Sequence, residues 1–323
     1  MPLNLDLIDT PEALADLAPA WSDLCSRDPA ATPFHTPDWL LPWTRHLWLG
    51  GRICSLAVHH GNRLVALAPM FTWGYGQQPQ QICVSFLGSG ITDYLGMTAD
   101  PEFAAEAARL VLHWLADHRA DWQICDLQEL RAGSPLLETD IPARIEAVIT
   151  ECSVCPVAEA PDTMADLEAR LPAAFRHNLH TAGNRLRKEP EAALVQSPAD
   201  ELIPALFRLH QTRRREREQQ GMFATDSLRT FHCEAINALA RAGIARLYGL
   251  RIAGEIVAVQ YNLIARNLCY LYLSRFDPRY RHVSPGMLLL RKSIRCASEE
   301  GARRLDFGAT GSPSNTDGAH RTT

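Results

Sequence analysis

The chain has 323 residues, of which 46% are hydrophobic and 21% are charged, and its formal net charge is −5. This length and balance predict a globular protein of one or two domains. The slight acidity argues against a protein that coats nucleic acid, while leaving room for a local basic groove. No stretch reaches the apolar length of a membrane span, and the first 20 residues carry acids where a signal peptide needs a basic start, so we expect a cytoplasmic protein.

The nine cysteines are an odd number, scattered through apparent strands and helices, which indicates reduced thiols rather than a disulfide framework. Cys152 and Cys155 have a spacing that suits metal or redox work, but no second Cys or His pair at zinc spacing accompanies them. We therefore predict no metal site. A P-loop, a dinucleotide-binding glycine fingerprint and a protease signature are also absent from the sequence.

The N-terminal half begins with two predicted helices, at residues 11–26 and from Thr36 onward. The second carries Trp39, Trp43 and Trp48 at near-helical spacing, which is typical of core packing; the alternative is an aromatic border of a substrate channel. A predicted hairpin with its turn at Gly61 and Asn62 follows. The remaining elements of this half are strands at 53–58, 63–72, 82–87 and 122–127 and a helix at 102–119.

Residues 156–162 are rich in proline and acids and mark a boundary between two halves. Residues 167–189 follow as a predicted basic helix, and residues 202–220 as a second helix whose Arg-Glu pairs indicate a solvated face. The first of these helices has too few acids to neutralise its cations, so we expect it to contact phosphate. Those cations are Arg176, Arg185, Arg187 and Lys188.

The C-terminal half has the clearest strand pattern. Three consecutive strands are predicted at residues 246–252, 255–264 and 268–276, because each run is apolar or alternating and rich in β-branched or aromatic residues. In the third strand Tyr270 and Tyr272 share one face with Ser274. A basic connection, residues 279–283, follows the third strand.

A helix is predicted from Ser284 to about residue 300, because serine is a preferred N-cap and Pro285 fits the first helical position. Gly301 ends it, and residues 303–307 form one more short strand. The start of this helix would present unpaired backbone N–H groups and a positive dipole end to an anion such as a pyrophosphate. The alternative is an ordinary helix start whose neighbouring arginines only solvate a loop.

The two halves show a short internal similarity. The sequence from Asn62 reads NRLVALA and that from Gly254 reads GEIVAVQ, and a further strand, a helix and a strand follow each hairpin. We infer a repeat of two similar halves, which rests on element order more than on identity.

Three antiparallel strands, a helix that begins in a basic loop and one more strand form the core order of the GNAT superfamily, which the chain resembles. Within it the chain is similar to the acetyltransferase domain of CelD-like, cellulose-biosynthesis-associated proteins, which are related to the FemAB group of tandem-GNAT enzymes. Four stretches carry the resemblance: residues 34–39 (FHTPDW), 86–94 (FLGSGITDY), 175–179 (FRHNL) and 270–307, with SPG at 284–286 and LDFG at 305–308.

The sequence also departs from these families. The spaced glycines of the ordinary GNAT phosphate loop are reduced to Gly286. CelD-like proteins continue past the LDFG region with a Tyr-Lys pair and further strands, whereas this chain continues with the polar, Gly/Ser-rich residues 309–323, for which we expect disorder.

The resemblance implies an α+β fold of tandem GNAT-like halves, each a mixed, mostly antiparallel sheet flanked by helices. The expected organisation is an N-terminal half at 1–160 and a C-terminal half at 161–308 that contains a basic helical insertion at 165–220. The implied activity is N-acyl transfer from acyl-coenzyme A or acetyl-coenzyme A to a small-molecule amine, without a metal.

N-acyl transfer requires an amine to lose a proton and a leaving thiolate to gain one, with both substrates held in attack distance. We expect Asp93 to bind the amine or accept its proton and Tyr94 to position it, in a cleft between the halves; the alternative is that Asp93 only caps a turn. Tyr272 would donate to the leaving sulfur, and Asp306 would line the same cleft. The predicted coenzyme A contacts are Arg279, Arg281, Ser284, Gly286, Met287 and Leu288, and the predicted substrate contacts are Arg176, Arg185, Lys188 and Arg275.

Two other functions fit the sequence. A FemAB-like transferase that uses aminoacyl-tRNA would hold the acceptor stem on the basic helix at 176–188, and co-purifying RNA rather than coenzyme A would reveal it. A non-catalytic binding protein with a GNAT fold would agree with the reduced glycine loop, and a thiol-release assay separates it from an enzyme.

Overall fold

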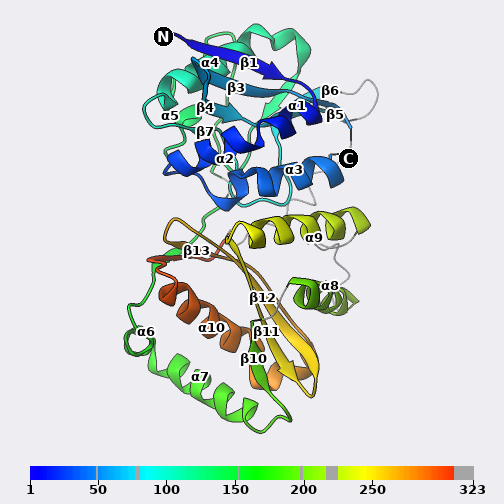
Figure 1. Cartoon of the computed structure of the whole chain (residues 1–323), viewed down its shortest axis with the longest axis vertical. Helices are drawn as coiled ribbons and strands as arrows, with labels where there is room; N and C mark the ends of the chain where they lie inside the picture. Colours follow the sequence, from blue (N-terminus) through cyan, green and yellow to red (C-terminus); the bar gives the residue numbers. More distant parts are fainter. Residues whose placement is uncertain (49, 77–80, 152, 197–198, 216–224, 309–323) are drawn as a thin grey trace. The chain divides into compact units, whose positions relative to one another are not determined.

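The computed structural model describes residues 1–48, 50–76, 81–151, 153–196, 199–215 and 225–308. These residues form two compact units, and the second unit begins at Ser153. Each unit is an α+β body with a mostly antiparallel arrangement of strands and with helices packed on it (Figure 1). The tail at 309–323 and Cys152, both subjects of sequence-based predictions, lie outside the described residues.

The strands of the first unit include two that are interrupted. One breaks at Cys54, whose N–H donates to the carbonyl of Met70 at 3.0 Å. The next breaks at Pro69, because proline has no N–H for the ladder. The strands are β1 (Leu3–Ile8), β2 (Arg52–Ile53), β3 (Ser55–His60), β4 (Arg63–Ala68), β5 (Met70–Tyr75), β6 (Gln81–Phe86), β7 (Thr98–Ala99) and β8 (Ile124–Asp126). They form sheets in the orders β1-β3-β4-β7 and β2-β5-β6-β8, which the interrupted strands connect.

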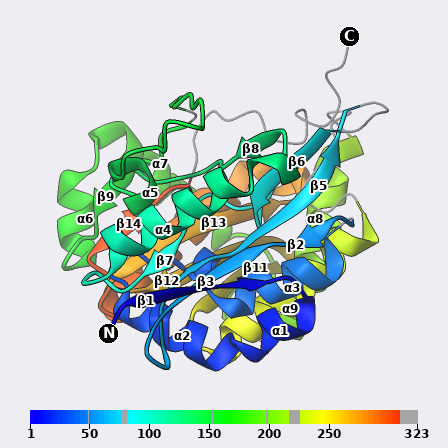
Figure 2. The same ribbon diagram turned by 90° about the horizontal axis from the view of Figure 1, so that it is seen from above.

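Helices cover both faces of this arrangement. The longest, α4 (Ala104–Asp117), lies on one side of β1 and β3 (Figure 2). The three helices that precede the β3–β4 hairpin in the sequence lie on the other side (Figure 2). Val111 and Leu115 of α4 belong to the same buried cluster as Leu56 and Ala66 of the strands. The other helices are α1 (Pro11–Asp16), α2 (Ala18–Arg27), α3 (Pro37–His46) and the short α5 (Pro135–Glu138).

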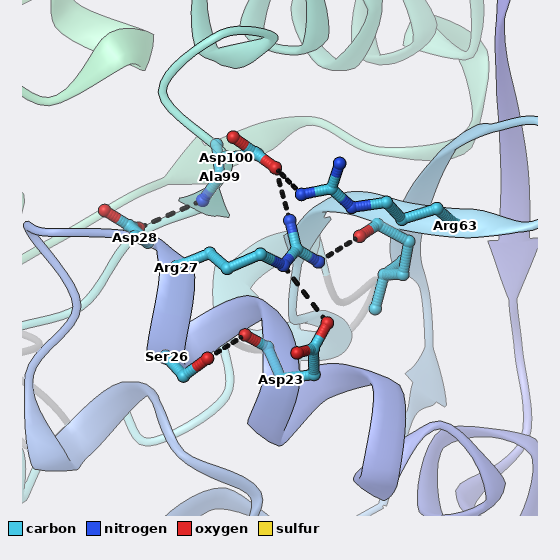
Figure 3. Close-up of polar contacts among 8 residues, drawn as sticks. Asp23, Ser26, Arg27, Asp28, Arg63, Ala99 and Asp100 are labelled. Atoms are coloured by element: carbon cyan, nitrogen blue, oxygen red, sulfur yellow. Dashed lines mark hydrogen bonds and ion pairs between the residues drawn. The ribbon is translucent and has the colours of Figure 1, made fainter.

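Arg27, at the end of α2, is the centre of a polar network that fastens this helix to the strands (Figure 3). Its guanidinium contacts the carboxylate of Asp100 and donates to the carbonyl of Leu64 at 2.8 Å. Arg63 of β4 donates to the same carboxylate oxygen at 2.5 Å. Because charge-assisted bonds of this kind are strong and directional, we assign the network to holding α2 against β4 and the end of β7.

The second unit contains one six-stranded sheet. Its strands are β9 (Val157–Glu159), β10 (Ala193–Val195), β11 (Ala245–Ile252), β12 (Glu255–Ala265), β13 (Leu268–Phe276) and β14 (Arg304–Asp306). They lie in the order β10-β11-β12-β13-β14-β9, and all neighbours are antiparallel except β13 and β14. The three central strands match the predicted ranges to within one residue at each end.

Tight turns connect the central strands of the second unit. Ala253 and Gly254 both have positive φ, 49° and 79°, as a two-residue turn between right-twisted strands requires. Arg266 and Asn267 repeat this geometry in the next hairpin. The predicted turn at Gly254 is therefore confirmed.

Two layers of helices enclose this sheet, with α7 and α10 on one face and α8 and α9 on the other (Figure 1). Gly249 of β11 permits the close approach of α8, because a Cβ at this position would lie 2.9 Å from a methyl carbon of Leu202. The helices are α6 (Met164–Arg170), α7 (Ala173–Leu186), α8 (Ala199–Arg215), α9 (Asp226–Arg241) and α10 (Pro285–Glu299), with the 3-10 helix η3 (Pro278–Val283) before α10.

The two units share one order of elements. In each, a hairpin is followed by a strand, a helix and a strand parallel to the one before the helix: β6, α4 and β8 in the first unit, β13, α10 and β14 in the second. The hairpin turns at Asn62 and Gly254 hold the same place in that order. The predicted α+β fold with two GNAT-like halves is therefore confirmed.

Several boundaries differ from the sequence-based expectation. The helix expected at 11–26 is divided at Leu17, because Pro19 cannot donate an N–H to the preceding turn and instead occupies the start of α2. Pro172 separates α6 from α7 for the same reason. The segment 165–220, expected to be a helical insertion, contains the edge strand β10, and the boundary segment 156–162 contains β9.

Candidate active site

The ladder between the parallel strands β13 and β14 is short. Its pairs are Leu268 with Arg304, Cys269 with Leu305, and Tyr270 with Asp306. β14 ends at Asp306, whereas β13 continues to Phe276 with β12 as its only described neighbour. The outer edge of this part of β13 therefore offers backbone N–H and C=O groups to a ligand.

A β-bulge lies in β13 directly after the last ladder pair. Tyr261 of β12 is opposite Leu273, but Leu263, two residues further, is opposite Tyr270, which is three residues away from Leu273. Tyr272 keeps the face of Tyr270, toward the helices α8 and α9. The extra residue brings Leu273 and Arg275 to that face as well, so the expectation that Ser274 shares it is wrong. The predicted catalytic tyrosine therefore lies beside the bulge, at the point where the two strands part.

Tyr272 packs between two buried rings. Its ring meets Tyr261 edge to face, with centroids 5.4 Å apart, and lies 6.4 Å from the imidazole of His232 in α9. Neither Tyr261 nor His232 has exposed surface. Burial, with a smaller effect of His210, lowers the pKa of His232 to about 3, so this imidazole is neutral at neutral pH.

Arg275, predicted to bind substrate, contacts a histidine of α8. Its Nε donates to Nδ1 of His210 at 2.9 Å, and its Nη1 donates to the carbonyl of Ser274 at 2.7 Å. Because arginine is always a donor, Nδ1 of His210 must carry the lone pair, and the proton of a neutral ring must be on Nε2. Arg275 thereby fixes the tautomer of His210.

Asp306 shares a face with Tyr270. Cys269 and Leu305, one residue earlier on each strand, pack in the cluster beneath α10, so the following pair projects toward α8 and α9. Asp306 is 2% exposed, and its Oδ1 accepts the N–H of Gly308 at 2.8 Å. The predicted pair Tyr272 and Asp306 therefore belongs to the same face of the sheet.

The start of α10 differs from the predicted cap. Ser284 has a left-handed backbone, φ 51°, and its side chain makes no capping hydrogen bond; its carbonyl instead accepts the N–H groups of Met287 at 3.1 Å and Leu288 at 3.3 Å. The expectation that the serine hydroxyl caps the helix is wrong, because this backbone directs the hydroxyl elsewhere. Among the described contacts none engages the N–H of Gly286, and a Cβ there would meet no atom within 4 Å.

The two arginines predicted at this end of β13 differ in their surroundings. Arg279 donates to both carboxylate oxygens of Asp277, at 2.6 to 3.1 Å, and these bonds hold the pKa of Asp277 below its usual value. Arg281 is exposed, and the described part of the chain gives its guanidinium no acid partner within ion-pair distance. Arg281 is therefore better placed than Arg279 to receive an external anion.

Two of the predicted substrate-binding cations of α7 already hold backbone carbonyls. Arg176 donates to the carbonyl of Leu171 at 2.7 Å, and Arg185 donates to that of His282 at 2.9 Å. The second bond ties α7 to η3, directly before α10. Lys188 is exposed beyond the end of the helix. Their contact with substrate stays a prediction.

In the first unit, two of the stretches that carry the family resemblance pack together. Trp39 donates through Nε1 to the hydroxyl of Thr92 at 3.0 Å, and Phe34 meets both Trp39 and Tyr94 through its ring. Tyr94 is 8% exposed and lies beneath the guanidinium of Arg131. These contacts give the ring of Tyr94 a place in the core of the first unit.

The turn that precedes Tyr94 depends on Gly88. Its φ is 94°, and a Cβ there would lie 2.9 Å from methyl carbons of Leu40 and Leu95. Asp93, the other predicted catalytic residue of this turn, is half-buried. Asp93 and Tyr94 belong to the first unit and Tyr272 to the second, so a catalytic site that combines them stays a prediction.

A buried histidine also lies near this turn. Nδ1 of His35 accepts the N–H of Thr32 at 3.1 Å, and burial, together with the charge of Arg131, lowers the pKa of His35 to about 4. The eight described cysteines are all free thiols, and burial raises the pKa of Cys54, Cys125 and Cys269 to about 12. Thiols of this kind are poor nucleophiles at neutral pH.

No cluster of three or more His, Cys, Asp or Glu side chains suited to a metal ion occurs within the described ranges. Of the helices that the structure describes, none has the length and apolar character needed to cross a membrane.

The sequence-based prediction omitted His210, His232 and Tyr261. They come from α8, α9 and β12, and only the packing of both helices on the sheet brings them to Tyr272 and Arg275. One signal was available for His232, since it occupies a core position on the apolar face of α9 beside Phe231 and Ile236.

Two units that share one order of elements, with a polar cluster where parallel strands part in the second, define a tandem α+β fold. Residues 173–315 match the family model described as Acetyltransferase (GNAT) domain. The chain accordingly contains a GNAT domain in its second unit, and the fold and this match support a GNAT-type transferase. A comparison with curated proteins finds no match.

Solved structures support the fold over nearly the whole chain. FemX is similar with a TM-score of 0.59 at 11% identity, covering 95% of this chain and 89% of FemX. The C-terminal domain of a putative lysylphosphatidylglycerol synthetase from Agrobacterium fabrum gives 0.54 at 12% identity, covering 91% and 78%. L-PGS from Bacillus licheniformis gives 0.52 at 12% identity, covering 90% and 75%. The predicted FemAB-like relation is thus supported at the level of the fold, while the closer relation to CelD-like proteins stays a prediction.

Proposed function

We propose that the protein transfers an acyl group from an acyl-coenzyme A thioester to a small-molecule amine in the second unit. The observation that carries this proposal is the parting of β13 and β14 after Tyr270 and Asp306, with Tyr272 on the same face of the sheet as that pair. A thioester donor needs an extended channel with polar groups at its end, and this edge of β13 supports such a channel.

The donor would enter with its phosphates at the start of α10. Arg281 would supply a charge-assisted contact, and the N–H of Gly286 would supply a backbone donor in open space. Met287 and Leu288 would contribute through packing at this end rather than through their N–H groups, which Ser284 already engages. The pantetheine arm would then run along the outer edge of β13.

In the proposed reaction the amine nitrogen attacks the thioester carbonyl, a C–N bond forms, and the C–S bond breaks. Asp306 accepts the proton that the amine loses, and Tyr272 donates the proton that the leaving thiolate gains. His232 takes no proton in this scheme, because burial lowers its pKa to about 3. Asp93 and Tyr94, in the first unit, are further proposed amine-binding residues.

A thiol-release assay tests the proposal. The purified protein is mixed with acetyl-coenzyme A or longer acyl-coenzyme A donors and a panel of primary amines, and free thiol is recorded with the wild type and with Tyr272→Phe. The proposal expects amine-dependent release that Tyr272→Phe reduces. Co-purifying tRNA without any coenzyme A turnover would favour the FemAB-like transferase instead. Absence of both coenzyme A turnover and bound tRNA would favour a non-catalytic binding protein.

A further inference from the structure

Tyr261 has a buried hydroxyl that lacks a hydrogen-bond partner in the described part of the chain. The side chain has no exposed surface, and burial raises its pKa, so the phenol is neutral. Because an unpaired buried hydroxyl costs free energy, such groups are rare, and a ligand that supplies a partner would recover that cost. The Tyr261 hydroxyl takes no part in the proton transfers proposed for Tyr272 and Asp306.

The position of Tyr261 connects it to the site. Gly249 and Val259 pair across β11 and β12, and Gly249 faces α8, so Tyr261, two residues after Val259, faces the same side. There its ring meets Tyr272 edge to face. Tyr272 is the partly exposed member of this pair, so a ligand that contacts Tyr272 arrives next to Tyr261.

We propose that Tyr261 is a binding residue for the acceptor, and that its hydroxyl accepts an N–H from the uncharged amine beside Tyr272. This inference rests on the proposed function and adds that the acceptor binds as an uncharged amine. The lone pair of the nitrogen stays available for attack, because the amine uses an N–H to contact the tyrosine. The contact would orient the nucleophile rather than move a proton.

The groups around Tyr261 favour an uncharged amine over an ammonium ion. His232 is neutral and fully buried, and the nearby charge of Arg275 is directed at His210. Within the described cluster around Tyr261, the acid that faces α8 and α9 is Asp306, at the end of the ladder. Desolvation disfavours the charged form of an amine, so an ammonium ion would lose its proton to solvent before the nitrogen reaches Tyr261, which leaves Asp306 to accept the proton that is lost on attack.

Tyr248 provides a matched control. It is a tyrosine of the adjacent strand β11, and like Tyr261 it has no exposed surface. Its ring lies on the opposite face, in the cluster with Leu288 and Leu289 of α10, under the ammonium of Lys292. Tyr248→Phe therefore removes the same atom at the same burial, away from the proposed acceptor.

The test compares thermal unfolding of the wild type, Tyr261→Phe and Tyr248→Phe, each with and without a panel of amino acids, amino sugars and polyamines. We expect at least one amine to raise the Tm of the wild type and of Tyr248→Phe, and to bind Tyr261→Phe about tenfold more weakly. Without ligand Tyr261→Phe should unfold at or above the wild-type temperature, because its hydroxyl has no partner to lose. With that amine and acetyl-coenzyme A, KM for the amine should rise while KM for the donor stays constant.

Equal stabilisation of Tyr261→Phe and the wild type would overturn the inference, and so would a panel in which no amine stabilises the wild type. The unfolding readout does not need turnover. A protein that binds amines through Tyr261 but releases no thiol would therefore contradict the proposed function while supporting the binding role of this residue.

Discussion

Tyr270 and Asp306 are the last paired residues of the parallel ladder between β13 and β14. Both side chains face α8 and α9, and beyond them the described part of β13 runs on with a neighbour on one side only. An acyl donor that occupies this edge would place its reactive carbon near Tyr272, since that tyrosine, two residues after Tyr270, faces the same side. The chemistry proposed for the second unit depends on this relationship.

Tyr272→Phe should lower kcat by about 100-fold, because general acid catalysis by a positioned group contributes on the order of 100-fold or more. Packing against Tyr261 and His232 is retained, so the temperature of unfolding should change little. Steady-state thiol release and thermal unfolding check both parts. A variant with full kcat would remove Tyr272 from the reaction.

Asp306→Asn should also reduce kcat by roughly 100-fold while the fold is kept, because the amide oxygen of asparagine can still accept the N–H of Gly308. Asp306→Ala serves as the comparison, since it removes that acceptor as well and should unfold at a lower temperature. If the two variants unfold at equally lowered temperatures and Asp306→Asn keeps the wild-type kcat, Asp306 has only a structural role.

Arg281→Ala should weaken coenzyme A binding by about 10- to 100-fold, the usual loss for one charge-assisted hydrogen bond. Arg279→Ala should leave that affinity nearly unchanged and destabilise the protein instead, because Arg279 pairs with Asp277. Calorimetric titration of coenzyme A into both variants separates the two residues. Equal loss of affinity in both would show that Arg279 can leave its acid to bind the donor.

The Asp277 pair adds a pH dependence to this comparison. The folded pKa of Asp277 is lowered, chiefly by the hydrogen bond from Arg279, so the pair contributes stability above the ordinary pKa of aspartate and loses it as pH falls through the lowered value. The difference in stability between the wild type and Arg279→Ala should therefore be present at pH 7 and shrink in strong acid. A difference that is constant down to pH 2 would contradict this assignment.

The buried histidines His35 and His232, one in each unit, should make the protein sensitive to mild acid. Burial lowers their pKa from the usual 6.5 to about 4 and about 3, so below pH 6.5 the unfolded chain takes up protons that the folded chain excludes. Stability should consequently fall with decreasing pH by up to about 1.4 kcal/mol per pH unit for each histidine. Urea unfolding of His35→Gln and His232→Gln from pH 7 to 4.5 should show a flatter dependence; a slope equal to that of the wild type would refute the assignment.

The central strands and α10 could be predicted from sequence because local signals agree there. Alternating apolar residues, the turn at Gly254 and the proline at position 285 each act within a few residues, and the observed bounds follow them closely. The edge strands β9 and β10 have three residues each and carry no such signal; only pairing with β14 and β11 defines them. For the same reason, the sequence could suggest Tyr272 and Asp306 as site residues but could not supply their neighbours.

The cluster around Tyr272 depends on contacts between distant parts of the chain. His210 and Arg275 are 65 positions apart, and no local pattern links them. Tyr272 follows period-two alternation from Tyr270, but the bulge shifts the face of the later side chains, so the direction of Arg275 could not be read from that alternation. Ser284 illustrates a further limit, since its identity suggests a capping hydroxyl while its left-handed backbone makes the carbonyl the acceptor.

The most direct test of the account is a calorimetric titration of coenzyme A into the nucleic-acid-free protein, repeated with Gly286→Trp. The account predicts saturable binding to one site per chain, and its loss or strong weakening in the variant, because a large side chain would fill the open space beside the N–H of Gly286. Unfolding temperatures of the two proteins should agree, since a Cβ at this position meets no atom within 4 Å. Absence of coenzyme A binding, or equal affinity in the folded variant, would contradict the claim that the second unit holds an acyl-coenzyme A donor at the start of α10.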